Sequence, residues 1–145
     1  MSPQQFWQRA GLAIAAAVIV NLAVYLVAKA AGVEILVPMG ASPVPLEAGL
    51  VVAFTVIPLV LAAVLLLVLR RVGVASPAVF AGAAAVVLLL SLSAPLSGDL
   101  AVSNKLVLAS MHAVAGLAAL AGLAPLFRGL RVGAPRSAAG VSAGA

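Results

Sequence analysis

Long apolar stretches alternate with short polar ones along this chain. A helix needs about 20 residues to cross the roughly 30 Å of hydrocarbon in a bilayer. Four stretches have about this length, at residues 10–28, 48–69, 77–96 and 106–127. Within them the only ionisable residues are Tyr25 and His112. The pattern therefore predicts four membrane-spanning segments.

Helices are the expected form of these segments. A helix satisfies all its backbone N–H and C=O groups within one segment, as the interior of a membrane requires. The strands of a closed barrel would alternate apolar and polar residues, and these stretches do not. We predict an all-α fold, a four-helix transmembrane bundle formed by residues 1–128. Residues 129–145 are rich in Gly, Ala and Ser, so we expect a disordered cytoplasmic tail.

The charged residues predict an orientation. In a four-pass arrangement one side of the membrane receives all six arginines: Arg9, Arg70, Arg71, Arg128, Arg131 and Arg136. The other side receives two lysines and every acidic residue: Lys29, Glu34, Glu47, Asp99 and Lys105. Cytoplasmic loops carry an excess of Lys and Arg. We therefore predict that both termini are in the cytoplasm.

The first stretch has a second interpretation. Arg9, the apolar run and Ala28-Lys29-Ala30 resemble a signal peptide with its cleavage site. The apolar core of a signal peptide usually has about 7–15 residues, and this run is longer. Lys29 would also stand inside the cleavage motif. We expect an uncleaved helix.

Composition agrees with the membrane interpretation. The 145 residues are 66% hydrophobic and 8% charged, against about 45–50% apolar and about 25% charged in soluble domains. Lipid is therefore the expected partner. The net charge of +5 is spread singly or in pairs beside the apolar stretches, which argues against a nucleic-acid partner. The abundance of Ala, Val, Leu and Gly suggests a bacterial genome, hence a plasma-membrane location.

Two connections have their own signals. The outer connection, residues 30–46, contains Pro38, Pro43 and Pro45, so we expect it to be irregular. The inner connection, residues 70–76, is short. It predicts that the second and third helices are antiparallel neighbours.

Polar residues inside the spans are the candidate functional residues, because a polar group in a membrane is costly. A rise of about 1.5 Å per residue puts His112 roughly 10 Å below the outer boundary. The other polar residues of the outer half come out at similar depths. The predicted polar layer consists of Asn21, Tyr25, Thr55, Ser91, Ser93 and His112.

Small residues continue two of the polar faces. Asn21 and Tyr25 share a helical face with Ala10, Ala13 and Ala17. The face of His112 contains Lys105, Ala109, Gly116 and Ala119. Small residues let helices approach closely, so both faces should contact other helices. We expect His112 to point into the bundle and to form a hydrogen bond with Tyr25 or Ser91.

The polar layer has three interpretations. Hydrogen bonds between membrane helices contribute about 0.6 kcal/mol each on average, so the layer could be purely structural. It could instead form a ligand or proton site open to the outer face, since imidazole carries protons near neutral pH. One His without any Cys cannot form a tetrahedral metal site, and haem held by two histidines would need a dimer. We predict no metal and no cofactor.

The sequence contains no recognisable set of catalytic residues. Ser91 has no base at a recognisable spacing and no Gly-x-Ser-x-Gly turn. The chain also has no Gly-rich phosphate loop. We therefore predict no catalytic residues.

Several short motifs together resemble a known family. They are Asn21 with Tyr25, Ala31-Gly32-Val33, the segment 91–96 (SLSAPL), Lys105, Leu108 and Met111-His112. The chain resembles, over nearly its whole length, small four-helix membrane proteins of high-GC Gram-positive bacteria that form a domain family of unknown function. The resemblance implies the fold and the location but no mechanism. Small multidrug exporters have a similar size, but they use a Glu buried in the first helix, and this first helix has no carboxylate.

Three functional hypotheses follow from these observations. The leading hypothesis is a non-enzymatic structural or accessory subunit that contacts another membrane protein, or a second copy of itself, through its helices. The alternative is a small transporter or ligand-binding protein with an outward-facing polar pocket around His112. A membrane enzyme is the third and weakest hypothesis, since no acid–base pair is visible.

Overall fold

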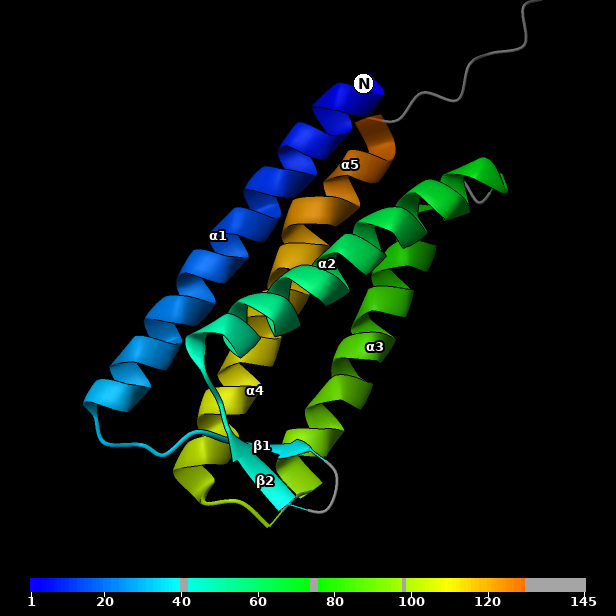
Figure 1. The fold of residues 1–145 in the computed structure, drawn as a ribbon. Helices are drawn as coiled ribbons and strands as arrows, with labels where there is room; N and C mark the ends of the chain where they lie inside the picture. Colours follow the sequence, from blue (N-terminus) through cyan, green and yellow to red (C-terminus); the bar gives the residue numbers. More distant parts are fainter. Residues whose placement is uncertain (40–41, 74–75, 98, 130–145) are drawn as a thin grey trace, which may run out of the picture.

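The computed structural model describes residues 1–39, 42–73, 76–97 and 99–129. Its main elements are the helices α1 (Pro3–Ala30), α2 (Ala48–Arg71) and α3 (Pro77–Ser97) and a fourth helical segment. The fourth segment runs without a break through α4 (Val102–Leu117), the π-helix η1 (Ala118–Leu123) and α5 (Ala124–Gly129). A hairpin of β1 (Leu36–Met39) and β2 (Ser42–Pro45) joins α1 to α2 (Figure 1). The predicted helical fold is therefore confirmed, with one small sheet added.

Three helical segments are long and apolar enough to cross a membrane. They are α1, α2 and the segment Val102–Leu126. The helix α3 has 21 residues and ends at Ser97. The predicted tail, residues 129–145, lies outside the described residues except for Gly129, which ends α5.

The helix α1 begins before the predicted span. The Ser2 hydroxyl accepts the backbone N–H of Gln5 at 3.2 Å, and the Gln5 side chain accepts the N–H of Ser2 at 3.0 Å. This capping box satisfies backbone donors of the first turn, and Pro3 follows the cap, where a missing N–H costs nothing. Gln4 and Gln5 of this turn are polar, so hydropathy alone places the start of the apolar span later.

The same helix ends at a glycine. The N–H of Gly32 donates to the Lys29 carbonyl and that of Val33 to the Ala28 carbonyl, both at 3.0 Å. This pair of bonds is a Schellman motif, which needs a residue with positive φ. Gly32 has a φ of +76°.

The four helical segments differ in how closely they pack against one another. The helix α1 packs against α2, α4 and η1, whereas α3 packs mainly against α4. The helices α2 and α3 approach each other near the turn that joins them and then diverge (Figure 1). The prediction that they are antiparallel neighbours is correct only near this turn. A short connection brings two helix ends together, but it does not determine their crossing angle.

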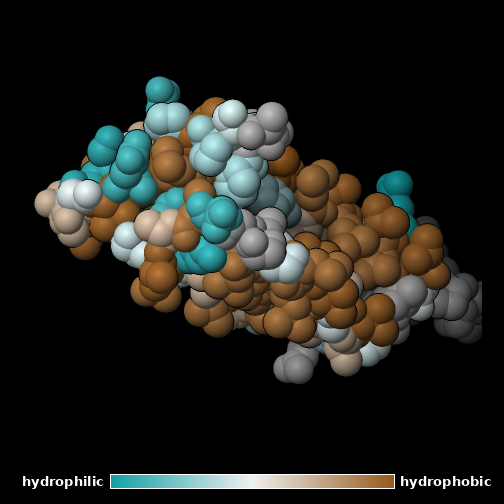
Figure 2. Space-filling view, turned by 90° about the horizontal axis from the view of Figure 1, so that it is seen from below, coloured by the Kyte–Doolittle hydropathy of each residue, from teal (hydrophilic) through white to brown (hydrophobic). Residues whose placement is uncertain are grey.

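Two buried apolar clusters form the core. One lies near the start of α1 and contains Phe6, Leu66, Phe80 and Leu123. The other lies near the hairpin and contains Tyr25, Ile35, Val51 and Met111. Many large apolar side chains are exposed along the helices. Seen from the hairpin end, hydrophilic residues gather over that end and hydrophobic residues cover much of the rest (Figure 2).

The prediction of an irregular outer connection is wrong, because two strands form there. Leu36 opposes Pro45 and Pro38 opposes Pro43. In an antiparallel pair, alternate positions direct their N–H groups away from the partner strand. The prolines all occupy this outward set, where they lack no strand-to-strand bond. A hydrogen bond of 2.8 Å from the Leu46 N–H to the Ile35 carbonyl closes the base of the hairpin.

Candidate functional site

A cavity of about 720 Å³ separates α2 from α3. Residues of α4 and η1, with Asn21 of α1, line its inner side, and Val37 and Pro38 of the hairpin lie at one end. The lining is almost entirely apolar. Its polar side chains are those of Asn21, Thr55, Ser91 and His112.

Asn21 is the most buried of these polar residues, with 2% of its surface exposed. Its Nδ2 donates to Thr55 Oγ1 at 2.9 Å and to the Met111 carbonyl at 3.4 Å. The Thr55 hydroxyl in turn donates to the Val51 carbonyl at 2.7 Å. The Thr55 hydroxyl proton is already donated, and a carbonyl has none, so both atoms near Nδ2 must accept. The network therefore determines which terminal atom of Asn21 is the nitrogen and which is the oxygen. Asn21 Oδ1 is buried and has no hydrogen-bond partner within the described part of the chain.

His112 lines the cavity, but its hydrogen bond differs from the expected one. Its Nδ1 contacts the carbonyl of Leu108, one turn earlier in the same helix, at 2.7 Å. The prediction of a bond to Tyr25 or Ser91 is therefore wrong. A carbonyl can only accept, so Nδ1 carries the proton, and in the neutral ring Nε2 is an acceptor. The backbone one turn away is always within reach of a helical side chain, whereas a partner on another helix must first be positioned.

The Ser91 hydroxyl also donates its proton to a backbone carbonyl of its own helix. Its Oγ donates to the Leu88 carbonyl at 2.8 Å. The oxygen keeps its lone pairs, so it can accept a further hydrogen bond. Leu88 lies against Gly116 on α4. Because α3 and α4 are antiparallel, Ser91 and His112, about one turn from this contact, lie at a similar level.

Two members of the predicted layer do not line the cavity. Ser93 is exposed and donates to the Leu90 carbonyl at 2.6 Å. Tyr25 is buried in the hairpin-side cluster, and the Nζ of Lys29 lies 5.9 Å from the centre of its ring. The structure thus brings four of the six residues to one cavity and separates Tyr25 and Ser93 from it.

The predicted small-residue faces are correct for one helix and shifted for the other. In α1 the buried residues include Ala10, Ala17, Asn21 and Tyr25, the face predicted from the sequence. In α4 the buried residues are Asn104, Leu108 and Met111. This face is displaced by one position from that of Lys105, Ala109 and His112, so His112 is half-buried.

The sequence interpretation missed Asn104. This side chain is 1% exposed. Its Oδ1 accepts the Leu36 N–H at 3.2 Å, and its Nδ2 donates to the Leu36 carbonyl at 2.9 Å. The amide thereby pairs with the outer edge of β1 as a neighbouring strand would. An Asn one turn before the buried Leu108 is the only signal in the sequence.

Among the described residues, no charged side chain lines the cavity. Glu34, Glu47 and Asp99 are exposed in the connections. Among the described residues, no group of three His, Asp or Glu side chains could hold a metal ion.

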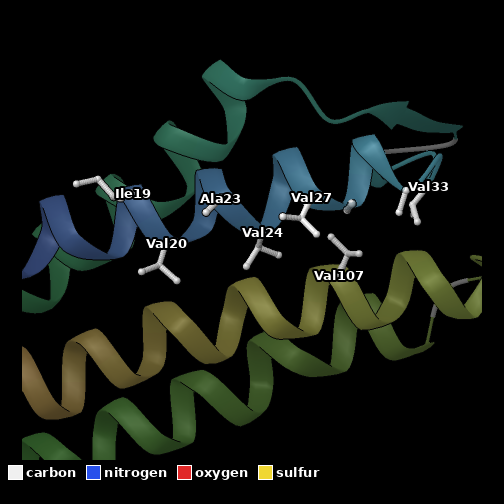
Figure 3. A pocket seen from close by; sticks show the side chains of 9 residues that line it. Ile19, Val20, Ala23, Val24, Val27, Val33 and Val107 are labelled. Atoms are coloured by element: carbon white, nitrogen blue, oxygen red, sulfur yellow. The ribbon is translucent and has the colours of Figure 1, made fainter.

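A second hollow lies on the outside of the bundle, between α1 and α4. It measures about 500 Å³ and is lined only by Ala, Val and Ile. Val20 and Val24 of α1 extend toward α4, and Val107 of α4 extends toward α1 (Figure 3). This groove offers no hydrogen-bonding side chain.

Comparison with known proteins identifies the family. No match was found among curated proteins or among solved structures. A family model matches residues 1–128, which include all the helices and the hairpin except the last residue of α5. The chain therefore belongs to DUF6069, a family of unknown function.

Proposed function

We propose that this protein binds a membrane-soluble ligand in the cavity between α2 and α3. The observation that carries the proposal is that the cavity opens sideways, between two long apolar helices. Leu61 on α2 and Val87 on α3 both line the cavity, yet 63% and 61% of their surfaces are exposed. A ligand dissolved in the bilayer would enter between these helices.

The size and lining of the cavity support this role. Ligand-binding pockets usually measure about 300–1,000 Å³ and combine an apolar lining with a few polar groups. The cavity has about 720 Å³ and four polar side chains. In the part of the chain that the structure describes, the lining holds one imidazole and no carboxylate, so we propose binding or transport rather than catalysis.

The proposed setting is a multi-pass protein of a bacterial plasma membrane with four spans and both termini in the cytoplasm. At about 1.5 Å per residue, the 21 residues of α3 extend roughly 31 Å, enough for a fourth span. Arg9 precedes the apolar part of α1, and Arg70 and Arg71 end α2. The positive-inside rule favours placing this end in the cytoplasm.

A cavity-filling substitution tests the binding function. Ala84 lines the cavity, whereas Ala78 is exposed on the same helix. We expect Ala84→Phe to abolish the co-purification of a membrane lipid, measured by native mass spectrometry in mild detergent, and Ala78→Phe to leave it unchanged. Equal lipid occupancy in the wild type and in Ala84→Phe would contradict the proposal.

An accessory subunit remains the second candidate, and the exposed groove between α1 and α4 favours it. Membrane helices associate by close packing of small side chains, and Ala23 is such a residue in the groove. In this case Ala23→Phe should reduce the recovery of partner proteins in a mild-detergent pull-down. Ala84→Phe should leave that recovery unchanged.

A further inference from the structure

We infer that the headgroup of the ligand is a neutral hydrogen-bond donor, so that the cavity takes a long-chain or isoprenoid alcohol. This inference rests on the proposed binding function and specifies its ligand class. It follows from the donors and acceptors that the polar side chains leave free toward the cavity.

Asn21 provides the first acceptor. Its side chain is 98% buried, and its Nδ2 protons are directed at Thr55 and Met111. The remaining oxygen, Oδ1, is buried without a partner among the described residues. A buried acceptor left unpaired is costly, and a donor from a ligand would remove that cost.

Ser91 and His112 add further acceptors. The Ser91 hydroxyl proton is bound to the Leu88 carbonyl, and the Nδ1 proton of His112 to the Leu108 carbonyl. The Ser91 oxygen and His112 Nε2 therefore remain as acceptors. The Thr55 hydroxyl donates to the Val51 carbonyl, so none of the four polar side chains in the described lining has a donor left for the ligand.

Two prolines in the cavity lining each lack a backbone donor. Pro58 lies inside α2 and Pro95 inside α3, and both line the cavity. A proline has no N–H to donate to the carbonyl four residues earlier. Those carbonyls belong to Phe54 and Ser91, which are themselves lining residues.

Charge selects among donor headgroups. An alkylammonium is a donor, but the described lining residues include no carboxylate to pair with it. Burying an unpaired charge in an apolar site is far more costly than burying a hydroxyl. A phosphate or carboxylate headgroup would need donors, which the lining does not offer. A hydroxyl can donate to the acceptors of the cavity, and it is uncharged, as the described lining without charged side chains requires.

The apolar lining selects the rest of the molecule. Phe54, Leu61, Leu65 and Val87 line the cavity and are exposed at its surface, where the bilayer would meet it. An alcohol with a long hydrocarbon chain would place its hydroxyl near Asn21, Ser91 and His112. Its chain would extend between α2 and α3 toward the lipid.

Three photoactivatable probes test the headgroup: hexadecanol, hexadecylamine and hexadecanoic acid, each with a diazirine in the same position of the chain. The protein is reconstituted in lipid nanodiscs, and crosslinks are mapped by mass spectrometry. We expect the alcohol to label α2 and α3 with a half-saturating concentration at least about fivefold below those of the amine and the acid. Stronger or equal labelling by the amine or the acid would overturn the inference but leave the binding function standing. No labelling of α2 and α3 by any probe would overturn both.

Matched variants test the acceptors. The substitutions Asn21→Leu and Ser91→Ala should each raise the half-saturating concentration of the alcohol about three- to tenfold, the effect of one lost hydrogen bond. Ser93→Ala should not change it, because Ser93 forms the same kind of bond to its own helix outside the cavity. If Asn21→Leu does not fold, the half-saturating concentration measured for Ser91→Ala tests the inference by itself. Unchanged alcohol labelling in Ser91→Ala, or an equal loss in Ser93→Ala, would contradict the inference.

Discussion

At the scale of single residues, the buried polar groups of this protein divide into satisfied and unsatisfied ones. Thr55 is fully used, since it accepts from Asn21 and donates to Val51. Asn104 is paired in both directions with Leu36. Among the residues that the structure describes, Asn21 alone combines deep burial with an unpaired side-chain acceptor. Unsatisfied polar atoms are rare in protein interiors, so this atom is the strongest residue-level indication of a binding site.

The bond between Asn21 and Thr55 should be measurable as a coupling. Thr55→Val should destabilise the protein, because it leaves the buried Asn21 amide without its shorter acceptor. Asn21→Leu combined with Thr55→Val should cost less than the sum of the two single substitutions. We expect a coupling free energy of about 0.6–1.7 kcal/mol, measured by unfolding in mixed micelles. Strict additivity would show that this bond contributes nothing.

At the scale of elements, close packing at glycines positions the fourth helical segment. A Cβ added at Gly122 in η1 would lie 2.7 Å from the Cβ of Ala13 on α1. The Ala13 methyl is attached directly to the backbone and cannot rotate away. The backbones of η1 and α1 therefore lie so close at Gly122 that a larger residue would require one of them to shift.

Gly122→Ala tests this contact. We expect the free energy of unfolding to fall by about 1–3 kcal/mol, the usual cost of overpacking a core. Gly82→Ala is the control, since nothing lies within 4 Å of its added Cβ. That substitution should stabilise α3 by about 0.5–1 kcal/mol through helix propensity alone. A stabilising Gly122→Ala would show that α1 and η1 have room to separate.

Two hydrogen bonds from the Asn104 side chain link the hairpin to α4. Asn104→Leu would remove both hydrogen bonds to Leu36, so we expect the Leu36 amide to exchange its hydrogen at least about tenfold faster. Ser103→Ala is the control, because Ser103 is exposed and adjacent. The measurement is hydrogen exchange followed by mass spectrometry. Equal protection of Leu36 in both variants would mean that the strand pairing alone holds the hairpin.

At the scale of the whole molecule, charge and apolarity are arranged along the bundle axis. The acidic residues Glu34, Glu47 and Asp99 all lie in connections at the hairpin end, whereas Arg70 and Arg71 end α2 at the opposite end. Three helical segments between these ends are long and apolar enough to cross a membrane. The positive-inside rule uses this distribution of basic residues to assign an orientation in the membrane.

Reporter fusions test the proposed orientation. A periplasm-active reporter should give a strong signal after Glu34 and after Asp99, and none after Gly73. A cytoplasm-active reporter at the same positions should give the opposite pattern. A strong periplasmic signal after Gly73 would exclude the four-span arrangement with both termini inside.

Local patterns of residues explain which features of the fold could be predicted from the sequence. Helix positions follow from runs of apolar residues, and the buried face of α1 follows from Ala10, Ala17 and Asn21 at helical spacing. The proline-rich connection misled the prediction, because prolines are excluded from a strand only at positions that bond to a neighbour. The partner of His112 was also misjudged, since its own backbone lies closer than another helix.

Taken alone, the sequence determined the helical character of the protein and the presence of helices long and apolar enough to cross a membrane, because hydropathy and helical spacing are properties of neighbouring residues. It also indicated Asn21, Thr55, Ser91 and His112 as polar residues within apolar helices. Only the tertiary structure decided that these four line one cavity and that Asn104 holds the hairpin. Those facts depend on the angle between α2 and α3 and on a contact between residues 36 and 104. Such long-range geometry results from the packing of the whole bundle, which no local pattern contains.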